Sequence, residues 1–92
     1  MLEKDLQIIN KLGIHARAAT LLIKLAEEFD ADITLSCNGM DADAKSILDV
    51  LMLAATCGTT VTLRIEGVDS EEEQKAMESI SELINNRFNE KE

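Results

Sequence analysis

One histidine, His15, stands two positions before an arginine, Arg17, and the chain contains no other histidine. A neutral imidazole is a nucleophile near neutral pH and a competent acceptor for a phosphoryl group. The guanidinium of Arg17 keeps its charge at every physiological pH, and its planar fork matches the oxygens of a phosphate. The pair therefore predicts phosphoryl chemistry, with His15 as the acceptor and Arg17 stabilising the anionic group.

The position of His15 supports this interpretation. It follows Gly13 in a predicted loop and directly precedes a predicted helix, whose free N–H groups and positive dipole end would stabilise an anion. Gly13 allows a tight turn and the close approach of a partner. A histidine at a helix start is by itself more often a cap or a surface residue. The prediction therefore depends on the glycine, the histidine and the arginine standing together.

The elements that must position His15 begin with four strands. Residues 2–9, 33–37 and 61–65 alternate apolar with polar side chains, which is the period of a half-buried strand. Asn38-Gly39 is a strong hairpin signal because both residues tolerate the positive φ of a type I′ turn. A short strand at 40–43 is therefore expected to pair with 33–37. The sheet should be at least partly antiparallel.

Three helices are predicted between and after these strands. The first begins just after His15, with an apolar stripe at helical spacing, and the second begins after Ser46 as its N-cap and ends before Gly58. Ser70 and Glu73 form a capping box for the third. The first helix carries the stripe Ala19, Leu22, Ile23 and Ala26, and the last carries Ala76, Met77, Ile80, Leu83, Ile84 and Phe88.

The predicted order is β-α-β-β-α-β-α. The fold class is α+β: an open-faced β-sandwich, in which a four-stranded, mainly antiparallel sheet is covered on one face by three helices. With 92 residues, no repeat and no linker, the chain is expected to form one domain over residues 1–92.

Composition excludes several classes of function. Eighteen acidic and nine basic residues give a formal net charge of −9, which repels nucleic acids and anionic membranes. No apolar run is long enough to span a bilayer and no secretory signal is visible, so a cytoplasmic location is expected.

Cys37 and Cys57 are expected to be unpaired and buried or half-buried. One histidine and two separated cysteines do not make a metal site, and no catalytic set of base, nucleophile and acid is visible.

The segment Gly13-Ile-His-Ala-Arg-Ala-Ala19 resembles the active-site motif of the HPr phosphocarriers of the bacterial phosphotransferase system (PTS), which usually reads Gly-(Leu/Ile)-His-Ala-Arg-Pro-Ala. Lys45-Ser46-Ile47-Leu48 resembles their regulatory serine region, and the order of elements is the same from end to end. The resemblance implies that His15 takes a phosphoryl group on Nδ1 from enzyme I and passes it to an EIIA protein. It implies no metal or cofactor, and no enzymatic activity of the carrier alone. Ala18 replaces the proline of the motif and is compatible with the same backbone.

Ser46 has two interpretations. It is a helix cap, or it is also the target of an HPr kinase/phosphorylase, as the resemblance implies; a phosphate there would add about −1.5 to −2 charge beside the docking surface. That surface is predicted on the first two helices, where apolar side chains point away from the core. Its expected members are Ala16, Thr20, Leu21, Lys24, Ile47, Leu48, Leu51 and Met52. Because a carrier that exchanges partners must dissociate quickly, the chain is expected to be a monomer.

Two other functions share some features of this sequence. An acyl carrier protein would hold its prosthetic arm on Ser70 in Asp69-Ser70, but three glutamates follow this serine and strands are predicted elsewhere, whereas acyl carriers are helical bundles. A regulatory HPr-like protein of a nitrogen-type branch keeps the same fold and chemistry. The sequence leaves that second alternative open.

Overall fold

A computed structural model describes all residues, 1–92. The order of elements is the predicted β-α-β-β-α-β-α. The elements are β1 (Leu2–Gln7), α1 (Ala16–Ala26), β2 (Asp32–Cys37), β3 (Met40–Asp43), α2 (Ile47–Met52), β4 (Thr60–Glu66) and α3 (Ser70–Asn85). A three-residue turn, Arg87–Asn89, follows α3.

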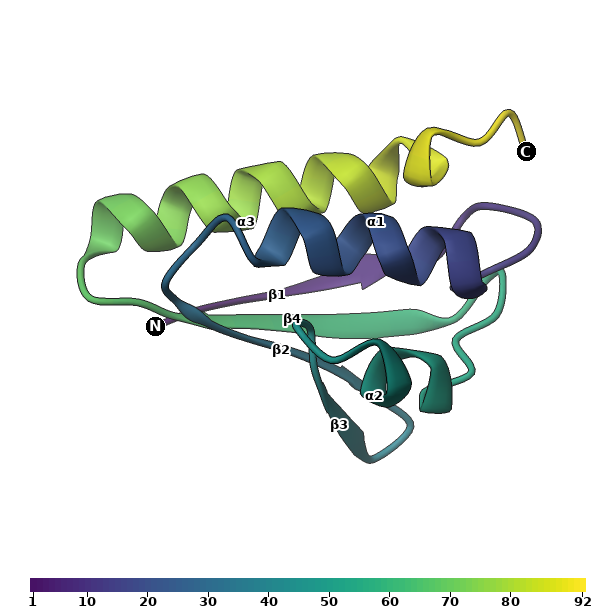
Figure 1. Ribbon diagram of the computed structural model, residues 1–92. Coiled ribbons are helices and arrows are strands. Elements are labelled where there is room, and N and C mark those ends of the chain that lie inside the picture. Colours follow the sequence, from purple (N-terminus) through teal and green to yellow (C-terminus); the bar gives the residue numbers. More distant parts are fainter.

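The four strands form one sheet in the order β1-β4-β2-β3, and every neighbouring pair is antiparallel. The hairpin predicted at Asn38-Gly39 joins β2 to β3, and both residues have the positive φ that this turn requires, 52° and 81°. The helices cover one face of the sheet, with α1 lying beside α3 and packing against α2 (Figure 1). The predicted open-faced sandwich is confirmed.

Between the sheet and the helices lies one cluster of 23 buried apolar residues. The inward positions of the strands alternate as predicted: Val61, Leu63 and Ile65 of β4 are completely buried, and the polar residues between them are not. The predicted helical stripes also reach the core, although Ile23, Met77 and Leu83 are only partly buried. The side chains that α1, α2 and α3 bury most deeply are Ala18, Ala19, Leu22, Ala26, Val50, Ala76, Ile80 and Ile84.

The start of α3 differs from the prediction by one residue. The N-cap is Asp69, whose Oδ1 accepts a hydrogen bond from the Glu72 N–H at 2.8 Å, so Ser70 is the first residue of the helix instead of its cap. Glu73 accepts from the Gly67 N–H at 2.9 Å and does not complete a capping box with Ser70. Aspartate is as good an N-cap as serine, and Asp69, which directly precedes Ser70, takes the N-cap position.

The end of α3 also differs from the prediction. The helix stops at Asn85, and Arg87, Phe88 and Asn89 all adopt left-handed backbone angles, with φ of 56°, 52° and 64°. Phe88 is 1% exposed, so it joins the core as predicted, but from this turn and not from a helical stripe. The turn brings the C-terminal segment to the end of the molecule where the β1–α1 loop lies (Figure 1).

Candidate functional site

The loop between β1 and α1 carries His15 and is tied into the core by polar contacts. Asn10 is completely buried. Its side-chain Nδ2 donates to the backbone carbonyl of Gly13 at 2.7 Å, and its backbone carbonyl accepts from the Gly13 N–H at 3.1 Å. The Ile14 N–H donates to the carbonyl of Ala55 at 2.9 Å. The residue before His15 is therefore held to the segment that follows α2.

Gly13 has a structural reason to be glycine. Its φ is +67°, and a Cβ atom here would lie 2.5 Å from the carbonyl oxygen of Ala55 and 2.9 Å from the Cα of Thr56. The predicted tight turn is present at Gly13. The close approach that it permits is made by the protein's own backbone, since the segment at Ala55 fills the space.

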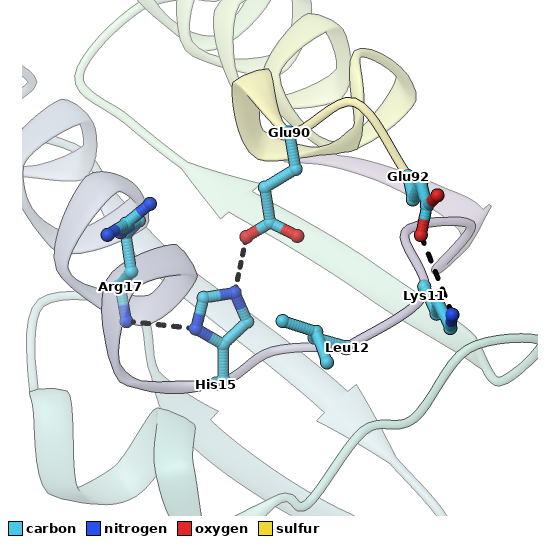
Figure 2. A pocket seen from close by; sticks show the side chains of 6 residues that line it. All are labelled: Lys11, Leu12, His15, Arg17, Glu90 and Glu92. Carbon is cyan, nitrogen blue, oxygen red and sulfur yellow. Dashed lines mark hydrogen bonds and ion pairs between the residues drawn. The ribbon is translucent and has the colours of Figure 1, made fainter.

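His15 is the N-cap of α1, and its two ring nitrogens have different partners (Figure 2). Nδ1 accepts a hydrogen bond from the Arg17 N–H at 3.2 Å, whereas Nε2 is paired with Oε2 of Glu90. A carboxylate only accepts, so the Nε2–H must be the donor and the ring proton is assigned to Nε2. Nδ1 then carries the free electron pair, and the side chain is 28% exposed. This nitrogen is therefore the one whose electron pair is available for attack.

Glu90 was not predicted from the sequence. Its second oxygen, Oε1, accepts from Nδ2 of Asn10 at 3.0 Å. Burial raises the pKa of Glu90, but the hydrogen bonds from His15 and Asn10 outweigh it, so the pKa lies below its ordinary value and the side chain stays a carboxylate. No motif surrounds this residue, and only the left-handed turn brings it to His15.

An open hollow of about 620 Å³ lies over His15 (Figure 2). Its lining residues are Lys11, Leu12, His15, Arg17, Glu90 and Glu92. Lys11 and Glu92 join across the rim, through a backbone hydrogen bond and an ion pair of 3.6 Å between Nζ and Oε2. Lys11, Leu12 and Glu92 were not predicted from the sequence, where they look like ordinary loop and terminal residues.

Arg17 and the first turn of α1 offer donors to an anion. Arg17 is exposed, and its one hydrogen bond is made by the backbone N–H, so the guanidinium is unpaired. The N–H groups of Ala16 and Ala18 have no acceptor either, because they precede the first intrahelical bond, which runs from the Ala19 N–H to the carbonyl of His15 at 2.8 Å. Ala18 is completely buried, so its N–H is not accessible although it has no acceptor, and the accessible backbone donor is that of the exposed Ala16.

The predicted docking residues lie on α1 and α2, which pack against each other. Three of them, Thr20, Leu21 and Leu51, are half-buried, and the rest are exposed: Ala16, Lys24, Ile47, Leu48 and Met52. Leu12, which sits in the hollow, is a further exposed apolar side chain. The structure thus presents apolar side chains on both helices and in the loop that carries His15.

Ser46 is the N-cap of α2, as predicted. Its Oγ accepts from the Asp49 N–H at 3.4 Å, and the residue is half-buried. Its surroundings are acidic, because Asp49 also accepts from the Asp43 N–H at 3.2 Å, while Nζ of Lys45 is occupied by the carbonyl of Phe29 at 2.7 Å. Ser46 does not line the hollow over His15.

The two cysteines have different environments and are unpaired. Cys37 is buried as predicted, but Cys57 is exposed, so the prediction of a buried or half-buried thiol is wrong for that residue. It lies between α2 and β4, where its Sγ reaches only the carbonyl of Ile9 at 3.7 Å. No group of three or more His, Cys, Asp or Glu side chains is arranged to hold a metal ion. No helix has the length and apolar character needed to cross a membrane.

Comparison with known proteins gives a consistent result. Residues 2–86 match the family model described as "PTS HPr component phosphorylation site". The chain is 52% identical over 90 residues to the phosphocarrier protein HPr of Cupriavidus necator, with 98% of each chain covered. It is 45% identical over 89 residues to the phosphocarrier protein NPr of Shewanella violacea, with 97% of this chain and 94% of the relative covered.

Solved structures agree with these relatives. The crystal structure of HPr-C-His from Thermoanaerobacter tengcongensis superimposes with a TM-score of 0.92 at 34% identity, and each chain is covered completely. A crystal structure of an HPr dimer from the same organism matches with a TM-score of 0.75 at 34% identity, covering 98% of this chain and 100% of the other. Fold, loop motif and sequence identity over the whole chain lead to one conclusion: the chain belongs to the HPr family of PTS phosphocarriers.

Proposed function

We propose that this chain is a cytoplasmic phosphocarrier that accepts a phosphoryl group on Nδ1 of His15 from phospho-enzyme I and transfers it to an EIIA protein. The observation that carries the proposal is the hydrogen bonding of the ring. Nε2 holds the proton against Glu90, and Nδ1 presents its electron pair at the N-terminus of α1, beside Arg17.

Transfer begins when the electron pair of Nδ1 attacks the phosphorus. The N–P bond forms while the bond from phosphorus to the donor breaks, and the electron pair of that bond leaves with the donor. The Arg17 N–H, now 3.2 Å from Nδ1, is released and can turn to a phosphoryl oxygen. The free N–H group of Ala16 and the unpaired guanidinium of Arg17, both on exposed residues, supply further donors. Positioning and charge stabilisation are most of what this reaction requires.

The surroundings of His15 fit a protein partner better than a small substrate. The hollow is open, and exposed apolar side chains on the adjoining loop and α2 form a surface for docking, among them Leu12, Leu48 and Met52. Donor and acceptor would use this face in turn, so the complex must dissociate between the two steps. We therefore propose that the working form is a monomer.

The proposal is tested by intact-mass measurement after incubation with enzyme I, Mg²⁺ and phosphoenolpyruvate, followed by addition of an EIIA protein. We expect one acid-labile phosphoryl group on the wild type, its loss when EIIA is added, and none on His15→Ala. Arg17→Ala should take up phosphate about 10²-fold more slowly because a charged donor is lost. An acid-stable phosphate, or equal labelling of His15→Ala, would overturn the proposal.

A regulatory, nitrogen-type branch is the second candidate for the pathway. The observation that favours it is the similarity to both named kinds of carrier, with 52% identity to an HPr and 45% to an NPr. Phosphorylated protein offered equal amounts of a sugar-type and a nitrogen-type EIIA discriminates between the branches. Faster transfer to the sugar-type acceptor supports the first proposal, and faster transfer to the nitrogen-type acceptor supports the second.

We also propose that an HPr kinase/phosphorylase phosphorylates Ser46 and thereby weakens docking of enzyme I. Support comes from the place of Ser46 at the start of α2, next to the exposed Ile47 and Leu48. The added charge would meet Asp43 and Asp49, so the modified surface becomes more acidic. Purified kinase and ATP should label the wild type and not Ser46→Ala. Equal labelling of both, or of neither, contradicts the proposal.

A further inference from the structure

We propose that Glu90 is a positioning residue for the transfer: it holds the proton of His15 on Nε2 and stabilises the positive charge that the ring acquires when Nδ1 takes the phosphoryl group. This inference rests on the proposed function. Nothing in the motif around His15 points to a residue 75 positions later. The assignment comes from geometry alone.

The carboxylate of Glu90 is placed with both oxygens in use. Oε2 accepts from Nε2 of His15, and Oε1 accepts from Nδ2 of Asn10 at 3.0 Å. Asn10 is completely buried and also donates to the carbonyl of Gly13 at 2.7 Å. One amide group therefore fixes the loop before His15 and the carboxylate that faces its ring.

The backbone that carries Glu90 is also fixed. Phe88, two residues earlier, is 1% exposed and anchors the left-handed turn in the core. The Glu90 N–H donates to the carbonyl of Arg87 at 2.9 Å, and the side chains of Asn86 and Asn89 are joined at 2.8 Å. Further along, Lys11 and Glu92 join the segment to the β1–α1 loop. Glu90 is thus held from both sides, as a positioning role requires.

The charge balance of the reaction shows what the carboxylate does. Before transfer, the ring is neutral, with a proton on Nε2 and an electron pair on Nδ1. After Nδ1 bonds to phosphorus and the donor leaves with its electron pair, the ring has a substituent on one nitrogen and a proton on the other, so it carries one positive charge. Glu90 already faces Nε2–H, and its attraction for that proton grows as the charge develops.

Glu90 does not block the reacting nitrogen. Its carboxylate approaches Nε2, whereas Nδ1 faces the backbone of Arg17 on another edge of the ring (Figure 2). The incoming phosphoryl group therefore meets the donors of α1 and not the negative charge. The phosphoryl group is therefore bound on the Nδ1 side of the ring, and the ring proton is held on the Nε2 side.

The first test is the rate of phosphorylation by enzyme I and phosphoenolpyruvate. We expect Glu90→Gln and Glu90→Ala to be slower than the wild type by about tenfold or more, the loss typical for a partner that orients a reacting histidine. Glu78→Gln is the matched control, because it removes the same charge from an exposed position of α3 that does not line the hollow over His15. Rates for both Glu90 variants within about twofold of the wild type would overturn the inference.

The second test reads the ring directly and does not need the partner proteins. In ¹⁵N-labelled unphosphorylated protein we expect Nε2 of His15 to be protonated, Nδ1 to be unprotonated, and the Nε2 proton to resonate far downfield and exchange slowly with water. Glu90→Ala should lose that proton signal by fast exchange, while Glu78→Gln keeps it. A signal that is unchanged in Glu90→Ala contradicts the inference.

The two proposals fail in different ways. If the wild type accepts no phosphoryl group, the proposed function fails, and the ring measurement still decides whether Glu90 holds the proton. If the wild type is phosphorylated and Glu90→Gln is phosphorylated equally fast, only the role of Glu90 fails. Unfolding curves of each variant show whether a slower rate comes from the loss of folded protein.

Discussion

His15 performs two tasks with one side chain. Its Nδ1 caps α1 by accepting from the Arg17 N–H, and the same nitrogen is the proposed nucleophile. An imidazole is an unusual cap, since serine, threonine, aspartate and asparagine supply oxygen acceptors that suit this position better. A weak cap can be given up during transfer, which makes its bond to Arg17 easy to exchange for one to a phosphoryl oxygen. The neighbouring Gly13 and Ala18 determine whether His15 stays at the N-cap position.

Gly13→Ala should destabilise the protein by about 3 kcal/mol, because the new methyl group requires a left-handed φ and also overlaps the backbone at Ala55. Gly39→Ala is the control: its φ of +81° imposes a similar conformational cost, but no atom lies within 4 Å of the added Cβ. Its loss should be only about 1 kcal/mol. Urea unfolding of the two variants measures the difference. Equal losses would show that the contact at Ala55 is not important.

Ala18→Pro restores the residue that the HPr motif usually carries. The Ala18 N–H has no acceptor, so proline removes no hydrogen bond, and its fixed φ suits the first turn of α1. We expect stability to rise by about 0.4–1 kcal/mol through the unfolded chain, while His15 is still phosphorylated. Thermal unfolding and the phosphorylation assay check both results. A loss of stability would mean that the Ala18 N–H has an unrecognised role.

At the level of elements, the C-terminal segment shows how a distant residue reaches the site. Left-handed geometry costs about 1–2 kcal/mol for each non-glycine residue, and three occur in succession at Arg87, Phe88 and Asn89. Burying the Phe88 side chain stabilises the turn by roughly 1.5–3 kcal/mol, and the hydrogen bonds of Glu90 contribute the rest. The sequence carries no signal for this turn, because none of the three residues is glycine. Tertiary contacts therefore decide whether this left-handed turn forms.

The hydrogen bonds of Glu73 at the beginning of α3 predict that stability depends on pH. Hydrogen bonds from the Gly67 N–H and the Met1 amino group lower the pKa of Glu73 below its ordinary 4.5. A carboxyl whose pKa is lower in the folded state contributes stability that is complete above pH 4.5 and disappears as the pH falls through the folded value. Glu73→Gln should therefore be less stable than the wild type at pH 7, and the difference should shrink below pH 4.5. Urea titrations at several pH values measure it.

Glu78→Gln is the control for this experiment, since it removes one charge from an exposed position of the same helix. A difference between wild type and Glu73→Gln that stays constant from pH 7 to pH 3 would contradict the assigned hydrogen bonds. The comparison also tests whether Glu73 fixes the junction between β4 and α3.

For the whole molecule, the sequence predicted the sheet, the three helices and the placement of His15 and Arg17, because each depends on local periodicity or on a contiguous motif. It missed Asn10, Glu90 and the rim pair Lys11 and Glu92, which depend on contacts between segments about 80 residues apart. Periodicity extended α3 to Phe88 because a buried aromatic in a turn and one on a helix stripe look alike in sequence. The part of the site that follows the motif was predictable, and the part made by the returning chain was not.

The measurement that tests the central claim most directly is NMR of the phosphorylated, ¹⁵N-labelled protein, which identifies the nitrogen bonded to phosphorus. The structure assigns the proton to Nε2 and the electron pair to Nδ1, so we expect the phosphoryl group on Nδ1 of His15 and a proton retained on Nε2. A phosphoryl group on Nε2, or on any residue other than His15, would contradict the account.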